Sequence, residues 1–299
     1  MSSNTLFKVK QATTGEITLT QASPSSTNPL PDASSPSCGF SMNQKNYSAF
    51  LQADSKKIDV YENTASSDAY FSLQASSPFD EVIDFLEAFT IAGNIYFIGY
   101  ATESAYIHFY ALQADFTVNL VYSGYIGSGY TMIKPLSYRN SIFFLAYNHT
   151  NGAVSKYQIM STSTHPVYIN ETWSDTWAQQ WHRFAFFQFG GENFFIKANT
   201  SHKKVNIDHL MDDLVEGSHP VLNESAPTYM LDAITAVSFQ DQQGNAFIVV
   251  AQSSGELSIN EIYPSCMGWK EQFSSSNELS SVKAVLPVSI DNDQYLLIA

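Results

Sequence analysis

Short apolar segments recur along the chain at nearly even intervals. They are residues 47–51, 95–98, 142–145, 194–196, 246–249 and 295–298. If Leu51, Ile98, Leu145, Ile196, Val249 and Ile298 are equivalent, successive copies are 47, 47, 51, 53 and 49 residues apart. This spacing matches a four-stranded blade, because known propeller repeats run about 40–50 residues. The pattern therefore predicts an all-β fold, a six-bladed β-propeller.

Each apolar segment has strand-like neighbours. Residues 105–110, 153–157 and 256–260 alternate between apolar and polar side chains, which is typical of a strand with one buried face. Upstream, the sequences at 91–94 and 189–192 contain glycine and read as tight turns between two strands. No comparable segment has a convincing helical period.

The two ends of the chain complement each other. The sixth copy stops at Ala299 after its second strand, whereas residues 5–10 and 15–20 are two strands without a blade of their own. We expect the N-terminal strands to complete the last blade, which would leave no open edge. The predicted blades, in one domain over 1–299, are 38–78, 79–124, 125–169, 170–222, 223–274, and 275–299 with 1–21; residues 22–37 connect into the first.

Composition narrows the range of partners. The formal charge is −14, and only Arg139 and Arg183 are arginines, which disfavours nucleic acid and anionic membrane surfaces. No stretch approaches the about 20 apolar residues of a membrane span. Residues 1–5 lack the basic and apolar regions of a signal peptide. We expect a cytoplasmic protein, with secretion by a non-classical route left open.

The sequence contains few signs of metal or covalent chemistry. Cys38 and Cys266 lack metal-ligand or CxxC spacing and are expected to be free buried thiols rather than a disulfide. The histidines show no metal-binding spacing, and no phosphate loop or nucleophile motif is present. Four carboxylates fall within residues 80–87, where they could serve acid–base catalysis, bind a hard cation, or simply be solvated. We expect neither a cofactor nor a metal.

The strongest candidate site is an aromatic cluster assigned to the fourth blade. Trp173, Trp177, Trp181, His182 and Arg183 lie within a dozen residues and include three of the four tryptophans. Indole faces stack on flat ligands, and arginine binds an anion or a carbonyl oxygen. Packing between blades is the alternative role for Trp181, and a buried network is the alternative for Arg183. Arg139, beside Tyr138 in a turn, is expected to be exposed.

Further candidates precede the innermost strands, whose entry loops line one mouth of a propeller. These residues are Tyr125, Tyr130, Tyr229, Asp232, Trp269 and Lys270.

The repeat pattern resembles a known family. Six blades, an N-terminal closing strand and the sequence at 181–191, WHRFAFFQFGG, resemble the fungal fucose lectins and bacterial propeller-lectin repeats. That resemblance implies sugar binding through an arginine, a glutamate and an aromatic in most blades. Here the corresponding column has no shared polar chemistry; it consists of Pro36, Phe85, Met132, Arg183, Ala233 and Ala284. Repeated fucose-type sites are therefore not expected.

Two main hypotheses follow. The favoured one is a small-molecule enzyme with a single aromatic pocket, similar in architecture to the propeller hetero-Diels–Alderases of fungal tropolone–sesquiterpenoid pathways. That similarity implies a cofactor-independent cyclase acting on apolar polyketides or terpenoids, with Arg183, His182 and Asp232 catalytic. Its substrate-binding residues would be Trp173, Trp177, Trp181, Tyr130 and Tyr229. The alternative is a lectin with one or few degenerate sugar sites, and a protein-interaction scaffold is a third possibility.

Overall fold

The structure, a computed structural model, is almost entirely β. It describes residues 4–12, 16–22, 30–52, 56–64, 69–79, 81–138, 141–162, 167–210, 218–275, 279 and 281–299. These residues form 24 strands and one short helix, α1 (Thr228–Leu231). Arg139 and Asp80 lie outside the described residues. No helix in the described part of the chain is long and apolar enough to cross a membrane.

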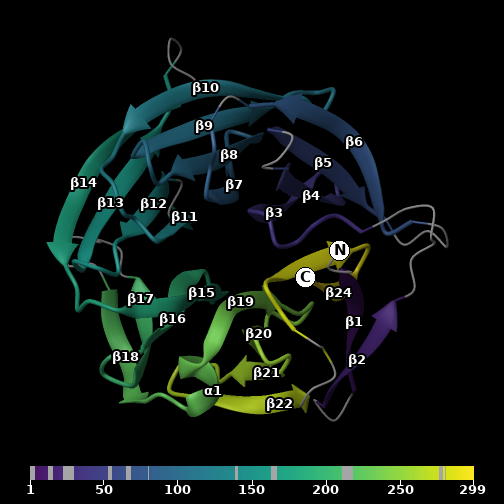
Figure 1. Ribbon diagram of the computed structural model, residues 1–299, viewed down its shortest axis with the longest axis vertical. Helices are drawn as coiled ribbons and strands as arrows, with labels where there is room; N and C mark the ends of the chain where they lie inside the picture. The colour runs from purple at the N-terminus through teal and green to yellow at the C-terminus, as the bar shows by residue number, and fades with distance from the viewer. Residues whose placement is uncertain are drawn as a thin grey trace. The chain divides into compact units, whose positions relative to one another are not determined.

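The strands make six four-stranded sheets, five of which follow the chain in simple order (Figure 1). The first sheet contains β3 (Ser37–Met42), β4 (Lys45–Gln52), β5 (Lys57–Asn63) and β6 (Phe71–Pro78), and the second β7 (Phe85–Ile91), β8 (Asn94–Ala101), β9 (Tyr106–Leu112) and β10 (Val118–Tyr125). The third contains β11 (Met132–Tyr138), β12 (Ser141–Tyr147), β13 (Ala153–Met160) and β14 (Tyr168–Thr176), and the fourth β15 (Trp181–Phe189), β16 (Glu192–Asn199), β17 (Lys204–Leu210) and β18 (Ser218–Ser225). The fifth contains β19 (Ala233–Gln240), β20 (Ala246–Gln252), β21 (Leu257–Ile262) and β22 (Trp269–Ser275).

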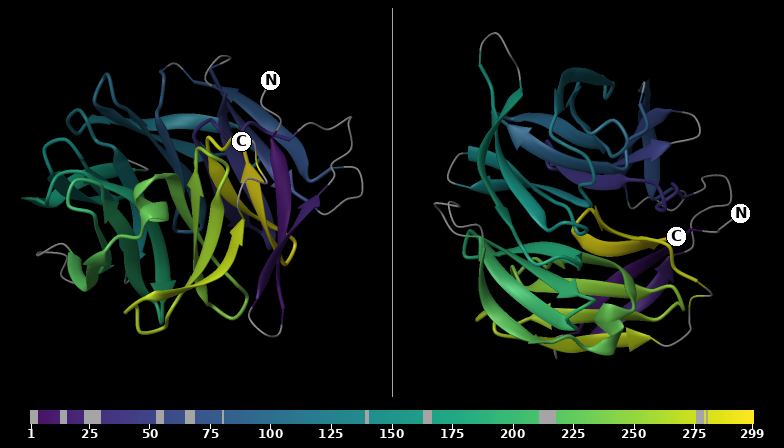
Figure 2. Two further views of the ribbon diagram at one scale, coloured as in Figure 1. Left: turned by 60° about the horizontal axis from the view of Figure 1, so that its bottom comes forward. Right: turned by 60° about the vertical axis from the view of Figure 1, so that its left-hand side comes forward.

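The sixth sheet joins both ends of the chain, as predicted. Its order is β2 (Ile17–Ala22), β1 (Thr5–Gln11), β24 (Asp293–Ile298) and β23 (Val285–Ile290). Thr5 pairs with Ile298 and Val9 with Gln294, and both views of Figure 2 show the N-terminal strands beside the C-terminal ones. The prediction of a six-bladed β-propeller with its last blade completed by the N-terminus is confirmed.

The chain forms two compact units, each with its own cores. The first unit comprises Pro24–Trp177 with Ser289–Asp291. The second unit comprises Met1–Ser23, Ala178–Val288 and Asn292–Ala299.

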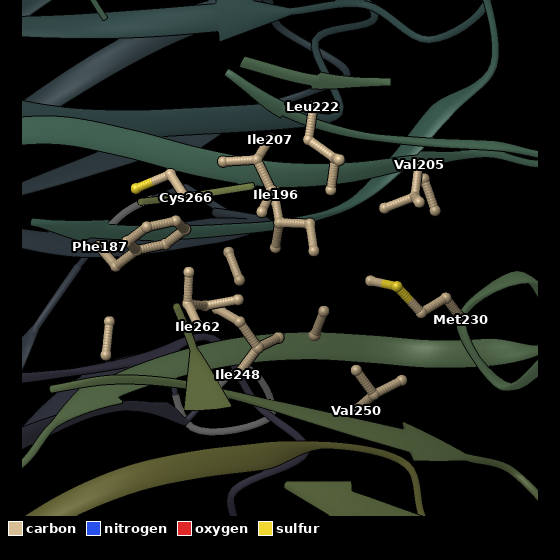
Figure 3. Packing of buried hydrophobic residues seen from close by; sticks show 14 of the residues in the cluster. Phe187, Ile196, Val205, Ile207, Leu222, Met230, Ile248, Val250, Ile262 and Cys266 are labelled. Atoms are coloured by element: carbon tan, nitrogen blue, oxygen red, sulfur yellow. The ribbon is translucent and has the colours of Figure 1, made fainter. Parts of the chain in front are cut away.

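In the second unit, the fourth and fifth sheets bury apolar side chains against each other. Figure 3 shows Ile196 and Ile207 of the fourth sheet pointing toward Ile248 of the fifth, and all three are at most 1% exposed. Burying an aliphatic side chain of this size contributes about 1.5–3 kcal/mol. The second strands of the sheets are therefore nearly continuous apolar runs, since both faces are covered.

The repeat residues identified from the sequence are all buried, but one needs a register correction. Val60 pairs with Ala49 in the first sheet, and Phe109 pairs with Ile98 in the second. In each sheet a one-residue β-bulge in the outermost strand follows this position, directly after Val60 in the first sheet and directly after Phe109 in the second. Ala49, not Leu51, is therefore the equivalent of Ile98.

A one-residue β-bulge recurs in the outermost strand of the first five sheets. Gln74, Val121, Thr172, Val221 and Gln272 are the extra residues. Just before each bulge, a polar residue of the third strand faces a serine or asparagine of the fourth. The pairs are Asp59–Ser76, His108–Ser123, Ser155–Ser174, Asn206–Asn223 and Ser258–Ser274. These five pairs, one in each of the first five sheets, occupy the same position of the repeat, which we call the polar column.

The cysteines follow the sequence expectation. Cys38 and Cys266 are free and buried. Burial raises the pKa of Cys266 to about 11 and that of Cys38 well above its ordinary value. Both thiols are therefore protonated near neutral pH and behave as small apolar groups.

Candidate functional site

Arg183 has unusual backbone and side-chain surroundings. It lies in β15 at a register shift between His182 and Ala185, and its φ of 58° is in the left-handed region that favours glycine. A residue other than glycine or asparagine there costs on the order of 1–3 kcal/mol. Its buried Nε has no hydrogen-bond partner within the described residues, and burial lowers the pKa of the guanidinium. Strain and an unsatisfied donor on one half-buried arginine are typical of a ligand contact.

Trp181 begins the same strand but is only 8% exposed. Lys197 Nζ lies 4.7 Å from the centre of its indole ring and 5.0 Å from that of Phe195. Lys197 is also 3.2 Å from Asp208, and both side chains are buried. One face of Trp181 thus takes part in an internal cation–π contact, which corresponds to the packing alternative. Its role as a pocket wall stays a prediction.

His182 is half-buried next to Arg183. Its Nε2 lies 3.4 Å from Oε1 of Gln180. Phe184 and Phe186, also half-buried, follow in the strand with ring centres 6.4 Å apart and nearly parallel. The residues that flank Arg183 in β15 are therefore a histidine and two half-buried phenylalanines.

Trp173 and Trp177 do not belong to the fourth blade, contrary to the boundary predicted at residue 170. Trp173 lies on β14 opposite Lys156 in the third sheet, and Trp177 directly follows β14. Both are half-buried, and both belong to the first unit. The sequence of β14 is polar and does not show which repeat it belongs to. In the structure β14 is the last strand of the third sheet, not the start of the fourth. The tryptophan cluster of the sequence is therefore divided between the two units.

Gly152 shapes the backbone around Trp177. The Trp177 N–H donates to the Gly152 carbonyl oxygen at 2.9 Å, and the Trp177 ring centre is 5.7 Å from that of Tyr147. Gly152 has φ of 80°, and a Cβ there would lie 2.2 Å from the Trp177 carbonyl oxygen. Only glycine fits this turn.

Gly152→Ala is therefore expected to destabilise the protein by about 2–4 kcal/mol, since it adds a backbone clash to the strain of a positive φ. Gly244→Ala is the matched control, because Gly244 has φ of 84° and open space around its Cβ position. Urea unfolding of both variants measures the difference. Equal losses would show that the approach of Trp177 to Gly152 does not constrain the turn.

Tyr229 and Trp269 lie together in the second unit. The Trp269 indole N–H donates to the Tyr229 hydroxyl at 2.8 Å, and that hydroxyl donates to Asn260 at 3.2 Å. Burial raises the pKa of Tyr229. Asp232 is exposed at the C-terminal end of α1, where its backbone N–H donates to Thr228. Lys270 follows Trp269 and is exposed. The hydroxyl of Tyr229 is thus engaged within the protein.

Tyr130 and Tyr125 have opposite surroundings in the first unit. Tyr130 is buried, and its hydroxyl donates to Ser155 at 3.3 Å. Its ring packs edge-on against Tyr100, 6.0 Å away between centres. Tyr125 is 68% exposed at the end of β10. Of these two, only Tyr125 presents its ring to solvent.

The carboxylates within residues 80–87 that the structure describes each have a different partner. Glu81 contacts His108, Asp84 accepts from the Thr102 N–H at 2.8 Å, and Glu87 pairs with Lys134 at 2.8 Å. The described carboxylates therefore act separately rather than as a catalytic pair.

Sequence reasoning missed His108 and Ser123. In the sequence, His108 is one residue of an alternating strand, and nothing in the pattern singles out Ser123. The polar column formed by the five cross-strand pairs would have identified them, because His108 is its only histidine. Finding that column requires the bulge register, which the sequence pattern does not reveal.

Comparisons with known proteins support the fold. No protein-family model matches the chain, and no curated protein matches it. Solved structures do. A candidate 6-phosphogluconolactonase from Bacteroides fragilis has a TM-score of 0.56 and 13% identity, covering 100% of this chain and 88% of the other. An exo-β-1,3-galactanase from Clostridium thermocellum has a TM-score of 0.55 and 11% identity, covering 91% and 66%.

A third similar structure is the exo-β-1,3-galactanase of Phanerochaete chrysosporium with galactose. Its TM-score is 0.54 and its identity 9%, covering 92% of this chain and 62% of the other. At such identities the likeness establishes the fold, and chemistry must be argued from the site. The chain is a β-propeller whose structural neighbours include enzymes. None of the three is a fucose lectin or a Diels–Alderase.

Proposed function

We propose that this protein binds a small molecule through Arg183. The observation that carries the proposal is Arg183 itself: its backbone is strained at φ of 58°, and the buried Nε of its side chain has no hydrogen-bond partner among the described residues. A buried N–H without a partner costs about 1–3 kcal/mol, so a ligand oxygen that accepts from it gains affinity. The ligand therefore has a carbonyl, carboxylate or similar oxygen.

The neighbouring residues define the rest of the ligand. Phe184 and Phe186 supply half-buried aromatic surface next to Arg183 in β15. An aromatic surface beside a single donor would suit a mainly apolar molecule held at one oxygen. A planar ring bearing a carboxylate, such as benzoate, is a small probe that combines both features.

A more specific hypothesis for this binding site is cofactor-free cyclisation of an apolar polyketide or terpenoid. Arg183 would polarise a carbonyl oxygen, and His182, as its neighbour, would supply a second donor. The aromatic surface would hold the reacting atoms close together. Trp173, Trp177 and Tyr130 as pocket walls, and Asp232 in a dehydration, remain predictions.

Benzoate titration followed by ligand-observed NMR tests the proposal. Native protein is expected to broaden the benzoate signals, and Arg183→Lys to lose most of that effect, because an ammonium cannot replace the planar guanidinium. The loss corresponds to about 1.5–3 kcal/mol for one charged hydrogen bond. Arg183→Gly separates binding from folding. It relieves the left-handed strain, so it should keep or raise the melting temperature while abolishing binding.

Equal broadening by native protein and both variants would remove Arg183 from the site. A fall in melting temperature for Arg183→Gly, with benzoate affinity intact, would identify a structural clamp. Glycan-array binding blocked by a simple monosaccharide and unaffected by Arg183→Lys would favour the lectin hypothesis instead.

A further inference from the structure

A serine, a histidine and a glutamate form a continuous hydrogen-bonded chain in the second sheet. His108 Nδ1 lies 2.6 Å from Ser123 Oγ, and His108 Nε2 lies 3.0 Å from Glu81 Oε2. Glu81 Oε2 also accepts from the Ser104 hydroxyl at 3.3 Å. His108 is 3% exposed, whereas Ser123 is exposed to solvent. A buried base therefore connects an accessible hydroxyl to a carboxylate.

The partners determine which ring nitrogen carries the proton. An ionised carboxylate only accepts hydrogen bonds, so Nε2 of a neutral His108 donates to Glu81. Nδ1 then has a lone pair, and the Ser123 hydroxyl donates to it. This is the order of groups that activates a serine nucleophile: hydroxyl, base, and a carboxylate that orients the base.

The propeller repeat explains how the second sheet acquired this arrangement. All five sheets with the bulge have a polar cross-strand pair at this position, but only the second has a histidine there. In the first sheet the Ser76 hydroxyl donates to Asp59 instead. A purely structural cross-strand pair does not need the third group, Glu81, which comes from a different segment.

Glu81 is held in place by the segment that enters the second sheet. Ile83, two residues later, is buried, and a Cβ at Gly99 would lie 2.8 Å from its Cγ2. Asp84 accepts from the Thr102 N–H and fixes the other end of the segment. The missing side chain at Gly99 therefore makes room for the loop that presents Glu81 to His108.

The surroundings of Ser123 are open and aromatic. Tyr106 and Tyr125 are directly opposite each other, on the same face as His108 and Ser123. They are 41% and 68% exposed, and their ring centres are 5.8 Å apart. β10 is the outermost strand of its sheet, so alternate backbone N–H groups point away from β9. Either Ser123 or Gly124 therefore presents such a donor within one residue of the nucleophile.

We propose that Ser123, His108 and Glu81 form a second site, which hydrolyses esters with an aromatic or apolar group. Ser123 Oγ attacks the ester carbonyl carbon while its proton moves to His108 Nδ1. The carbon–oxygen bond to the alcohol then breaks, and the alcohol leaves with that proton. Water attacks the acyl-serine, again losing a proton to Nδ1, which returns to Ser123 as the acid is released. Glu81 is a positioning residue that keeps Nε2 protonated.

The test combines a fluorophosphonate probe with p-nitrophenyl acetate hydrolysis. Mass spectrometry of the full chain is expected to find one phosphonate adduct, on Ser123. Ser123→Ala should abolish the adduct and lower kcat/KM for the ester about 100-fold or more, the range for general-base-assisted attack. Because Ser123 is exposed, this variant should fold normally. Glu81→Gln should lower kcat while leaving KM unchanged.

Ser76→Ala is the matched control, since Ser76 occupies the same position of the repeat opposite an aspartate. It should retain the full labelling and hydrolysis of the native protein. The proposal is overturned by an absent adduct, by an adduct elsewhere, or by equal losses in the Ser76 and Ser123 variants. Because the site does not involve Arg183, the Arg183 variants should keep this activity.

Discussion

Deletion of residues 1–22 is expected to give an insoluble or unfolded chain. These residues include β1 and β2, half of the sixth sheet, and without them β24 becomes an unpaired edge. Ile17, Phe7 and Val9 also pack in the core that contains Leu296 and Ile298. Loss of this contact exposes both an apolar face and a row of unpaired backbone groups, which favours aggregation. The soluble fraction and circular dichroism after expression provide the measurement.

A single substitution tests the same closure without shortening the chain. Leu6 is fully buried in β1, and Leu6→Asp should cost at least about 4 kcal/mol because it places a carboxylate where water has no access. That is a large share of the about 5–15 kcal/mol that stabilises a typical domain. Lys10→Asp introduces the same residue at an exposed position of the strand and should change little. A soluble Leu6→Asp protein with native melting would contradict the closing role of β1.

Much of the fold could be predicted because a strand buried on both faces appears in the sequence as an apolar run. The second strands carry nearly continuous apolar runs, so their spacing reveals the repeat; the burial of Ile98, Leu145 and Ile196 confirms it. The closure could be predicted because the sixth repeat stops after its second strand, β24, while β1 and β2 have no blade of their own. The tight turn predicted at 91–94 from its glycine is confirmed, since Ala92 and Gly93 both have the positive φ that a two-residue hairpin requires.

The outermost strands were harder to predict. β14 has exposed or half-buried residues throughout, so hydrophobicity does not mark its place in the repeat. The predicted boundary at residue 170 therefore cut through it and assigned Trp173 to the wrong sheet. The bulges are also absent from the pattern, because one extra residue in a polar strand changes the register without changing its composition.

The candidate sites depend on features that sequence alone does not encode. The scarcity of arginine points to Arg183, but its positive φ, and an Nε with no partner in the described part of the chain, appear only in the structure. His108 was overlooked, because its partners Glu81 and Ser123 are 27 and 15 residues away. Both sites arise where a local rule is broken, at a strained residue and at a buried histidine, as expected for functional positions.

Breaking the buried ion pair of the fourth sheet, Lys197–Asp208, should be strongly destabilising. Asp208→Ala is expected to cost about 3–5 kcal/mol, because it leaves the Lys197 ammonium, 4% exposed, without the carboxylate 3.2 Å away. Lys197→Met combined with Asp208→Leu removes both charges and should recover most of the loss. Urea unfolding at pH 7 measures all three proteins.

The pH dependence distinguishes an uncompensated charge from lost packing. Burial lowers the pKa of Lys197, and Asp208 opposes that shift, so the Asp208→Ala variant should have a still lower lysine pKa. Between that pKa and the ordinary lysine value of 10.5, the folded state binds fewer protons than the unfolded state. Unfolding free energy therefore rises with pH in this window, and the deficit of the variant should shrink as pH approaches 10.

Glu87→Ala, which breaks the partly exposed pair with Lys134, should cost only about 0–1 kcal/mol. A deficit for Asp208→Ala that is constant between pH 7 and 10 would mean that Asp208 stabilises the sheet by packing rather than by charge.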